Sequence, residues 1–438
     1  MQKSKCKNQN NKLKIKINKI ILIEGALFCF LILGFKINPV YPQSQQLNLN
    51  ALIEEAKDKN PEILSAKKRW EASRHRIPQM KSLDNPTVGL NFEKIPRSTF
   101  QLNNTMPEDR MLSVTQMFPF FGKLPLRGKV ALAESQMLSA EYKQKELEVI
   151  ASLKNAYYDL FMNYKEKELN EQSLELLKSI TRAAEAKYAV GEVSQDELFK
   201  LNLEIARMNN LILNLGEERR SKETRLNALL NREPEAQLAV PLLSEEVSFE
   251  SDFKSLYQAV LVSQPELIIF SYAIEKNRYA KSLAQRSFFP DTMAGIVQRG
   301  ITSGMFGPWD LMLSFSVPFW FWTKQRYEVK EAIANLEEAE AAYQAMKNKA
   351  FSEVKDLAVK VEIAQNKIEL SQANLIPILE SSISSSLTAF SSGKGNFMLL
   401  LDNQRMLIEL KMEYYKNLVE YHMNLADLER TTGVKLSH

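Results

Sequence analysis

Long stretches of the chain carry apolar residues at alternating intervals of three and four, the spacing along which helices pack as a coiled coil. Two stretches rich in helix-forming residues, 125–189 and 324–388, each precede such a stripe. The stripes consist of Leu198, Leu201, Ile205, Met208, Ile212, Leu215, Leu226 and Leu229, and of Leu407, Leu410, Tyr414, Leu418, Tyr421, Leu425 and Leu428. A helix over 125–189 would be about 95 Å long, so we expect long helices packed antiparallel. Pro377 either kinks the second helix or begins a new one.

A period of two residues appears in two shorter segments. Leu311, Leu313, Phe315 and Val317 alternate with Met312, Ser314 and Ser316, which predicts a strand with one apolar face. The predicted strands are 87–92, 111–118, 292–298 and 311–317. Aromatic residues crowd their ends, namely Phe118, Phe120, Phe121, Phe288, Phe289, Trp309, Phe319, Trp320, Phe321 and Trp322. These features suit a membrane β-barrel, and a small soluble β-subdomain with an aromatic core is the alternative.

The order of these elements occurs twice along the chain. Asn60-Pro61-Glu62-Ile63 recurs as Gln264-Pro265-Glu266-Leu267 roughly 200 residues later, which indicates a duplication. The first predicted repeat, 43–240, has a short helix, a β-hairpin (86–119), a long helix (125–189), a tip (190–194) and a helix (195–231). The second, 241–438, has a short helix, a β-hairpin (291–319), a long helix (324–388), a tip (391–396) and a helix (397–431). Because four strands are too few to close a barrel, several copies must share one.

The start of the chain reads as an export signal. Residues 1–19 hold seven Lys and no acid, and a mostly apolar segment follows over 20–35. We predict a signal peptide over 1–42, with cleavage somewhere between Val40 and Gln45; a lone amphipathic helix is the alternative. Both cysteines, Cys6 and Cys29, lie in this segment, and lipidation of Cys29 is a second possibility. Without residues 1–42 the net charge changes from +4 to −3, so nothing favours nucleic acid as a partner.

The ordered landmarks resemble the TolC-like outer membrane efflux protein family over essentially the whole predicted mature chain. The matching segments are the repeated element order, the hairpin exit Gln116-Met117-Phe118-Pro119-Phe120-Phe121-Gly122-Lys123, the turns at 187–194 and 390–393, and the segment 399–405. The resemblance implies a mainly α-helical fold with a membrane β-barrel portion. Three chains would form a homotrimer with a twelve-stranded β-barrel in the outer membrane lipid and a twelve-helix α-barrel in the periplasm. Within the family the hairpin exit is most similar to members that serve heavy-metal cation pumps.

The resemblance also implies roles for particular residues. An adaptor would dock at the tip, which contains Val190, Gly191, Ser194, Gly393 and Asn396. Asp402 matches an acidic position of the pore gate, whereas Leu399 stands where well-known members carry an acid, and Glu197 is grouped with them. From the residues themselves, Gly permits the positive φ that ends a helix. Ser194 and Glu197 have the spacing of a capping box, and Asn396 stands at the cap position of the second turn.

The implied function is that of a passive exit duct for small solutes or metal cations, working with a periplasmic adaptor protein and an inner membrane pump. A soluble periplasmic coiled-coil scaffold or adaptor is the alternative. We expect no enzyme and no cofactor, because the sequence has no phosphate-binding loop and no nucleophile motif. We also expect no metal site, because His75, His422 and His438 are not at ligand spacing. The methionines Met106, Met111, Met117, Met305 and Met312 could be soft copper ligands, although scattered Met more often serves packing.

Overall fold

The computed structural model describes residues 47–95, 106, 109–191, 193–250, 252–300, 307–391 and 397–436, and all of them belong to one compact unit. The predicted signal peptide lies outside these residues. So do Gly393, Asn396, Met305 and His438. No described helix is both long and apolar enough to cross a membrane.

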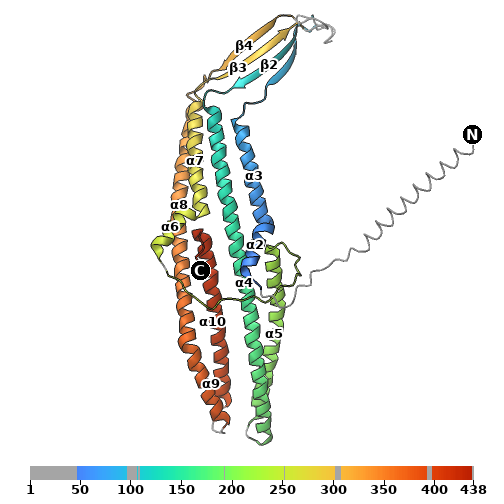
Figure 1. The fold of residues 1–438 in the computed structure, drawn as a ribbon, viewed down its shortest axis with the longest axis vertical. Coiled ribbons are helices and arrows are strands. Elements are labelled where there is room, and N and C mark those ends of the chain that lie inside the picture. Colours follow the sequence, from blue (N-terminus) through green and yellow to red (C-terminus); the bar gives the residue numbers. More distant parts are fainter. Residues whose placement is uncertain are drawn as a thin grey trace, which may run out of the picture. The chain divides into compact units, whose positions relative to one another are not determined.

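Each repeat contains two short helices, two strands and two long helical segments (Figure 1). The first repeat consists of α2 (Leu49–Lys59), α3 (Pro61–Lys81), β1 (Thr87–Phe92), β2 (Arg110–Phe118), α4 (Lys123–Ala189) and α5 (Gln195–Leu229). The second consists of α6 (Phe253–Ser263), α7 (Pro265–Arg286), β3 (Asp291–Arg299), β4 (Trp309–Ser316), α8 (Gln325–Leu370), the π-helical turn η3 (Ser371–Leu375), α9 (Ile376–Ser391) and α10 (Phe397–Thr432). The prediction that the fold is mainly helical with a few antiparallel strands is confirmed.

The structure has two short helices before each hairpin, where the sequence pattern predicts one. The repeated X-Pro-Glu segment is the reason, since a residue before proline is driven out of the helical region. Asn60 is extended (φ −66°, ψ 124°), and its side chain accepts hydrogen bonds from the N–H groups of Glu62 (2.9 Å) and Ile63 (3.3 Å). Pro61 then occupies the first turn of α3, where its missing N–H costs nothing. Pro265 does the same for α7.

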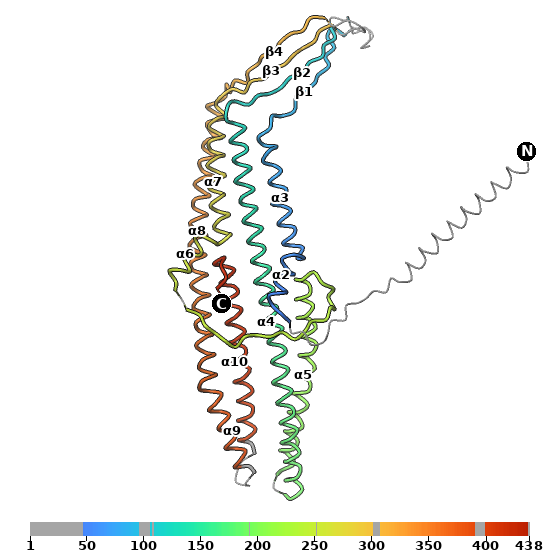
Figure 2. Tube along the Cα trace, viewed as in Figure 1, coloured from blue at the N-terminus to red at the C-terminus, as the bar shows by residue number. Residues whose placement is uncertain are grey.

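The core lies where the two repeats meet, along α4 and α10 (Figure 2). Next to the sheet the helices pack in the order α3, α4, α7, α8, and toward the tips in the order α5, α4, α10, α8. Tyr158 and Phe161 of α4 contact the rings of His422 and Tyr415 of α10, and both belong to a buried apolar cluster that includes Val419 and Ala426. This apolar contact stabilises the two repeats as one unit.

The two hairpins join into one antiparallel sheet in the order β1-β2-β3-β4. The join is the pairing of β2 with β3, in which Val114 lies opposite Ile296. Since side chains alternate between faces, Val88, Val114, Ile296 and Leu311 form one row across all four strands. The side chains of this row are exposed, as are those of Leu313 and Phe315 on the same face. The opposite face carries mostly small and polar residues, such as Gly89, Ser113, Thr115 and Ser314.

The second long helix continues through Pro377. The helix changes to a π-helical turn at Ser371–Leu375, and α9 resumes at Ile376. Leu370, Ser371 and Ile376 all have helical dihedral angles. A π turn absorbs the hydrogen bond that proline cannot make. Of the two readings of Pro377, the structure therefore supports an interruption within a continuous helix. The corresponding helix of the first repeat, α4, is a single α-helix of 67 residues.

Candidate functional site

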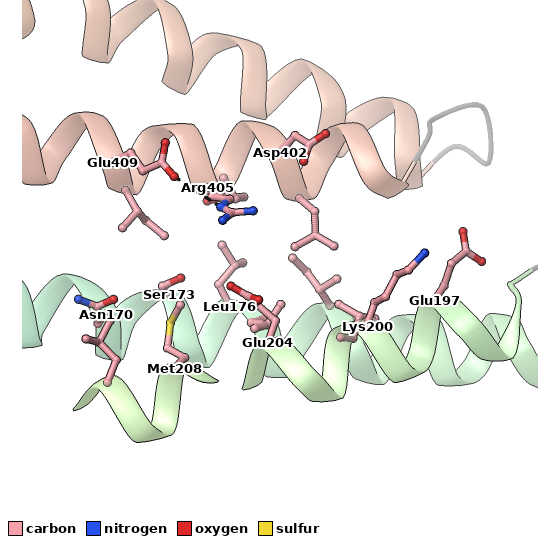
Figure 3. A pocket seen from close by; sticks show the side chains of 17 residues that line it. Asn170, Ser173, Leu176, Glu197, Lys200, Glu204, Met208, Asp402, Arg405 and Glu409 are labelled. Carbon is pink, nitrogen blue, oxygen red and sulfur yellow. Dashed lines mark ion pairs between the residues drawn. The ribbon is translucent and has the colours of Figure 1, made fainter. Parts of the chain in front are cut away.

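A groove lies between the two helical hairpins near their tips. Its cavity of about 430 Å³ is bounded by α4, α5 and α10 (Figure 3). Apolar lining comes from Leu176, Leu177, Ile180, Leu201, Met208, Leu211, Leu401 and Ile408. Leu401 packs against the buried cluster of Leu177, Ile180, Ala184 and Leu201. The second hairpin thus contacts the first through an apolar side chain at this level.

The groove brings together two of the predicted gate residues from opposite hairpins. Asp402 of α10 and Glu197 of α5 both line it, together with Lys200, Glu204 and Arg405. Figure 3 shows Arg405 and Glu409 on one side of the cavity and Lys200 and Glu204 on the other. The third predicted gate residue, Leu399, is exposed and is not part of the groove lining.

The predicted capping box at the start of α5 is confirmed. The Ser194 hydroxyl accepts the N–H of Glu197 (3.3 Å), and the Glu197 Oε2 accepts the N–H of Ser194 (2.7 Å). The Ser194 backbone N–H and hydroxyl together hold the pKa of the Glu197 carboxyl below its usual value. Glu197 therefore fixes the beginning of α5, and it also lines the groove.

The tip of the first hairpin presents an open backbone to solvent. Gly191 has φ +81°, a conformation that favours glycine, and nothing lies within 4 Å of the position that a Cβ would occupy. Val190 beside it is 71% exposed. In the second hairpin, the predicted tip residues Gly393 and Asn396 lie outside the described residues. The first tip thus offers an exposed apolar side chain on a tight turn.

A second arrangement of polar groups lies where α4 and α10 meet the linker between the repeats. Lys154 of α4 and Glu429 of α10 form a largely buried ion pair. His422 lies 3.1 Å from the Ser244 carbonyl of the linker, so its Nε2–H donates to that oxygen. Burial lowers the pKa of His422, the Ser244 carbonyl opposes this, and the Lys154 ammonium lowers it further. Sequence reasoning missed this arrangement, because the partners come from three distant segments.

The structure does not gather the candidate metal ligands into a site. Among the described residues no three His, Cys, Asp or Glu side chains lie together as a metal site would need. His75 is on α3 and His422 on α10. Met111, Met117 and Met312 share the polar face of the sheet, where Met111 is buried, and Met106 is exposed.

Comparisons with known proteins agree with this architecture. The chain superimposes on the outer membrane channel OprN (TM-score 0.72, 17% identity, covering 90% of this chain and 94% of that one). It also superimposes on VceC from Vibrio cholerae (TM-score 0.73, 18% identity, covering 89% of this chain and 97% of that one). A third similar structure is CusC (TM-score 0.74, 15% identity, covering 90% of this chain and 96% of that one). At these identities the likeness establishes the fold. No curated protein matches the sequence. The family model described as outer membrane efflux protein matches residues 52–232 and 256–434, one stretch in each repeat. The chain therefore belongs to the outer membrane efflux protein family.

Proposed function

We propose that this chain is one subunit of a trimeric outer membrane channel, the passive exit duct of a tripartite efflux system. The observation that carries the proposal is the sheet. It exposes apolar side chains on one face, and the outer edges of β1 and β4 have no strand partner among the described residues. Membership of the outer membrane efflux protein family and the similarity to the outer membrane channel OprN support the same role.

The exposed face of the sheet has the composition of a lipid-facing surface. Leu311, Leu313 and Phe315 alternate along β4, with exposed fractions of 63%, 60% and 62%. In water, such a patch invites aggregation, whereas in a barrel the apolar positions alternate with polar ones that face the lumen. The polar opposite face of this sheet suits a water-filled lumen. These features disfavour the alternative of a soluble periplasmic scaffold.

The outer strands β1 and β4 can be satisfied by further copies of the chain. Four strands are half of the roughly eight that the smallest membrane barrels use, so one chain cannot close the sheet. Three copies would supply twelve strands if β1 of one chain paired with β4 of the next. The helices support the same head-to-tail arrangement, because α5 exposes Phe199, Leu203 and Leu213 at one edge and the α8–α9 segment exposes Leu370 and Ile378 at the other.

The tips would supply the contacts with partners in the periplasm. Family resemblance assigns the tip at Val190, Gly191 and Ser194, with Gly393 and Asn396, to docking of an adaptor that links the duct to an inner membrane pump. The same resemblance assigns Asp402 and Leu399, with Glu197, to the gate. Lining of one groove by Asp402 and Glu197 supports a narrow charged passage there. No covalent chemistry or cofactor is part of this role.

The class of exported solute stays a prediction. The hairpin exit at 116–123 is most similar to members that serve heavy-metal cation pumps, and CusC is among the similar structures. A duct of this kind needs no tight metal site, so the packing of the methionines neither supports nor opposes this subgroup. We propose small solutes or metal cations as cargo.

The proposal can be tested by charging one face of β4 at a time. Leu313→Lys places a charge on the apolar face, where it would cost roughly 2–4 kcal/mol near the bilayer midplane. Ser314→Lys, its matched control, places the same charge one residue away on the polar face. We expect the Ser314 variant to be recovered from outer membranes as a trimer that dissociates on heating, and the Leu313 variant to be depleted. Recovery of the unaltered protein as a soluble monomer would contradict the proposal.

A further inference from the structure

Cationic side chains gather where the four helices meet the sheet. Lys81 ends α3, Arg127 and Lys129 lie near the start of α4, Arg286 ends α7, and Lys324 and Arg326 lie at the start of α8. These six residues, which we call the basic collar, come from helices that pack side by side in the order α3, α4, α7, α8. Figure 1 shows that all four helix ends adjoin the same end of the sheet. The collar therefore spans the width of the chain.

Side-chain contacts fix part of the collar at this level. The aliphatic stem of Lys81 lies over Gly128, where a Cβ would be 2.4 Å from the Lys81 Cγ. The Arg286 guanidinium lies over Gly122 and donates to the Phe121 carbonyl (2.5 Å). Because glycine has no side chain, Gly128 leaves room for the Lys81 side chain of α3, and Gly122 leaves room for the Arg286 side chain of α7. Helices α3 and α7 thus bring their cations to the start of α4.

The charges of the collar have no carboxylate partner among the residues that the structure describes. Lys123 at the same junction shows the contrast, because it is buried, with its Nζ 2.7 Å from the Asp291 Oδ1. In the described part of the chain, no member of the collar makes an ion pair with a carboxylate. Lys129 lies over the Tyr279 ring at 5.2 Å, which leaves its charge in place. The nearest acid along α8 is Glu328.

The position of the α4 cations runs against the helix dipole. The amino end of a helix carries partial positive charge and favours acids, yet the first turn of α4 has none. Lys123 stands in that turn, and Arg127 and Lys129 follow in the second turn. Cations at this place are unfavourable in an isolated helix, and a bound anion would remove that cost.

The order of surfaces along the molecule indicates what the anion is. The exposed apolar face of the sheet comes first, followed by exposed aromatics in the links to the helices, including Phe121, Phe319 and Trp320. The collar follows within about six residues of the helix ends, or about 9 Å. In a bilayer, hydrocarbon, an aromatic interface and a headgroup layer of roughly 5–8 Å succeed one another in the same order.

We propose that the basic collar binds the headgroups of anionic phospholipids in the leaflet next to the helices. This inference rests on the proposed function, because it requires the sheet to be in the membrane. Anionic lipids attract clustered Lys and Arg near a bilayer surface, and salt weakens the attraction. The collar would hold the barrel at a fixed depth and select the lipids around it.

The test compares two variants that remove equal charge. The collar variant carries Lys81→Gln, Arg127→Gln, Lys129→Gln, Lys324→Gln and Arg326→Gln, and it keeps Arg286 because that side chain holds the Phe121 carbonyl. The control replaces Lys167, Lys178, Arg207, Arg220 and Lys360 with Gln; all five lie on α4, α5 or α8 away from the sheet and pair with neighbouring acids on their own helices. Each protein is reconstituted in phosphatidylcholine vesicles with and without phosphatidylglycerol. The lipids retained after mild extraction are then identified by mass spectrometry.

We expect the unaltered protein and the control to retain phosphatidylglycerol about fivefold above its share of the vesicle, and the collar variant to retain it at its share. High salt should reduce the enrichment, and inorganic phosphate at matched ionic strength should not add to that reduction. Equal enrichment in all three proteins would overturn the inference. So would a collar variant with unchanged lipids and a lower preference for anions in conductance, because its charges would then face the channel. Failure of every protein to insert would instead refute the membrane placement itself.

Discussion

Tyr157 and Tyr158 are neighbours on α4, and both are buried, yet only one of them has a hydroxyl that ties distant segments together. The Tyr157 hydroxyl accepts the N–H of Leu242 (2.8 Å), and it lies within donating distance of the carbonyls of Leu242 (2.7 Å) and Leu47 (2.8 Å). Tyr158 packs against the His422 ring at 5.4 Å. Tyr157 therefore anchors the linker between the repeats and the segment before α2.

Tyr157→Phe should loosen the linker without disturbing the core. The ring stays, but the Leu242 N–H loses its partner, at a cost of roughly 1–3 kcal/mol for a buried donor. Limited proteolysis should then cut within 233–250 several times faster than in the unaltered protein. Tyr158→Phe is the matched control, and its cleavage rate should not change. Equal rates for both variants would show that the hydroxyl does not hold the linker.

The hydrogen bonds and ion pairs of individual side chains can be predicted only where the two partners are close in sequence. Ser194 and Glu197 are three residues apart, and that spacing alone predicts their reciprocal hydrogen bonds. Tyr157 lies 85 residues from Leu242 and 110 from Leu47, so no local pattern distinguishes it from Tyr158. The ion pair of Lys154 with Glu429, 275 residues apart, was hidden for the same reason.

At the scale of elements, the two long hairpins differ in what holds them together. The first contains the apolar cluster of Leu177, Ile180, Ala184 and Leu201. In the second, Asn403 of α10 donates to the hydroxyls of Ser382 (3.3 Å) and Ser386 (2.9 Å) of α9. The π-helical turn and Pro377 stand directly before this polar segment. The second hairpin is thus the more easily displaced of the two.

Pro377→Ala should make α9 more rigid. Alanine supplies the N–H that proline lacks, and proline inside a helix costs about 3 kcal/mol relative to alanine. Amide hydrogen exchange in 376–391 should slow, while exchange in the corresponding part of α4 stays the same. Ser384→Ala serves as a control, since Ser384 is an exposed residue of the same helix. Unchanged exchange in the proline variant would mean that the π turn already compensates fully.

Element types followed from the sequence because each has its own period. The alternation of Leu311, Leu313 and Phe315 predicts a strand, and β4 spans Trp309–Ser316. The π turn could not be predicted, because Ser371–Leu375 has ordinary helix-compatible residues and Pro377 fits either a kink or a restart. The division between α2 and α3 at Asn60 differs from the single short helix that the sequence predicts, because Pro61 both belongs to the repeated segment and begins a new helix.

For the whole molecule, the decisive contact is the pairing of β2 with β3, which joins strands from different repeats. The alternating patterns predict two hairpins but not their order in a sheet, because pairing depends on the meeting of segments far apart in the chain. Once the order is known, Val88, Val114, Ile296 and Leu311 form an apolar row from edge to edge. In the proposed trimer, this face would meet the lipid.

In the proposed trimer, Asp402 would place three carboxylates near the axis. Asp402→Ala should then raise single-channel conductance in planar bilayers and lower the preference for cations, because the ring of negative potential is lost. Glu409→Ala is a useful control, since Glu409 lines the same groove seven residues further along α10. Unchanged conductance and selectivity for the Asp402 variant would remove it from the gate.

The two edges of the chain are different surfaces, with β1, α3 and α5 on one side and β4, α8 and α9 on the other. In a head-to-tail ring every seam joins one edge of each kind. A subunit damaged at a single edge can still be recruited through its intact side, and the finished ring then has one seam that leaks. When damaged and normal copies are made in the same cell, most of the proposed rings would contain at least one damaged subunit. Mutations at one edge would therefore be dominant-negative.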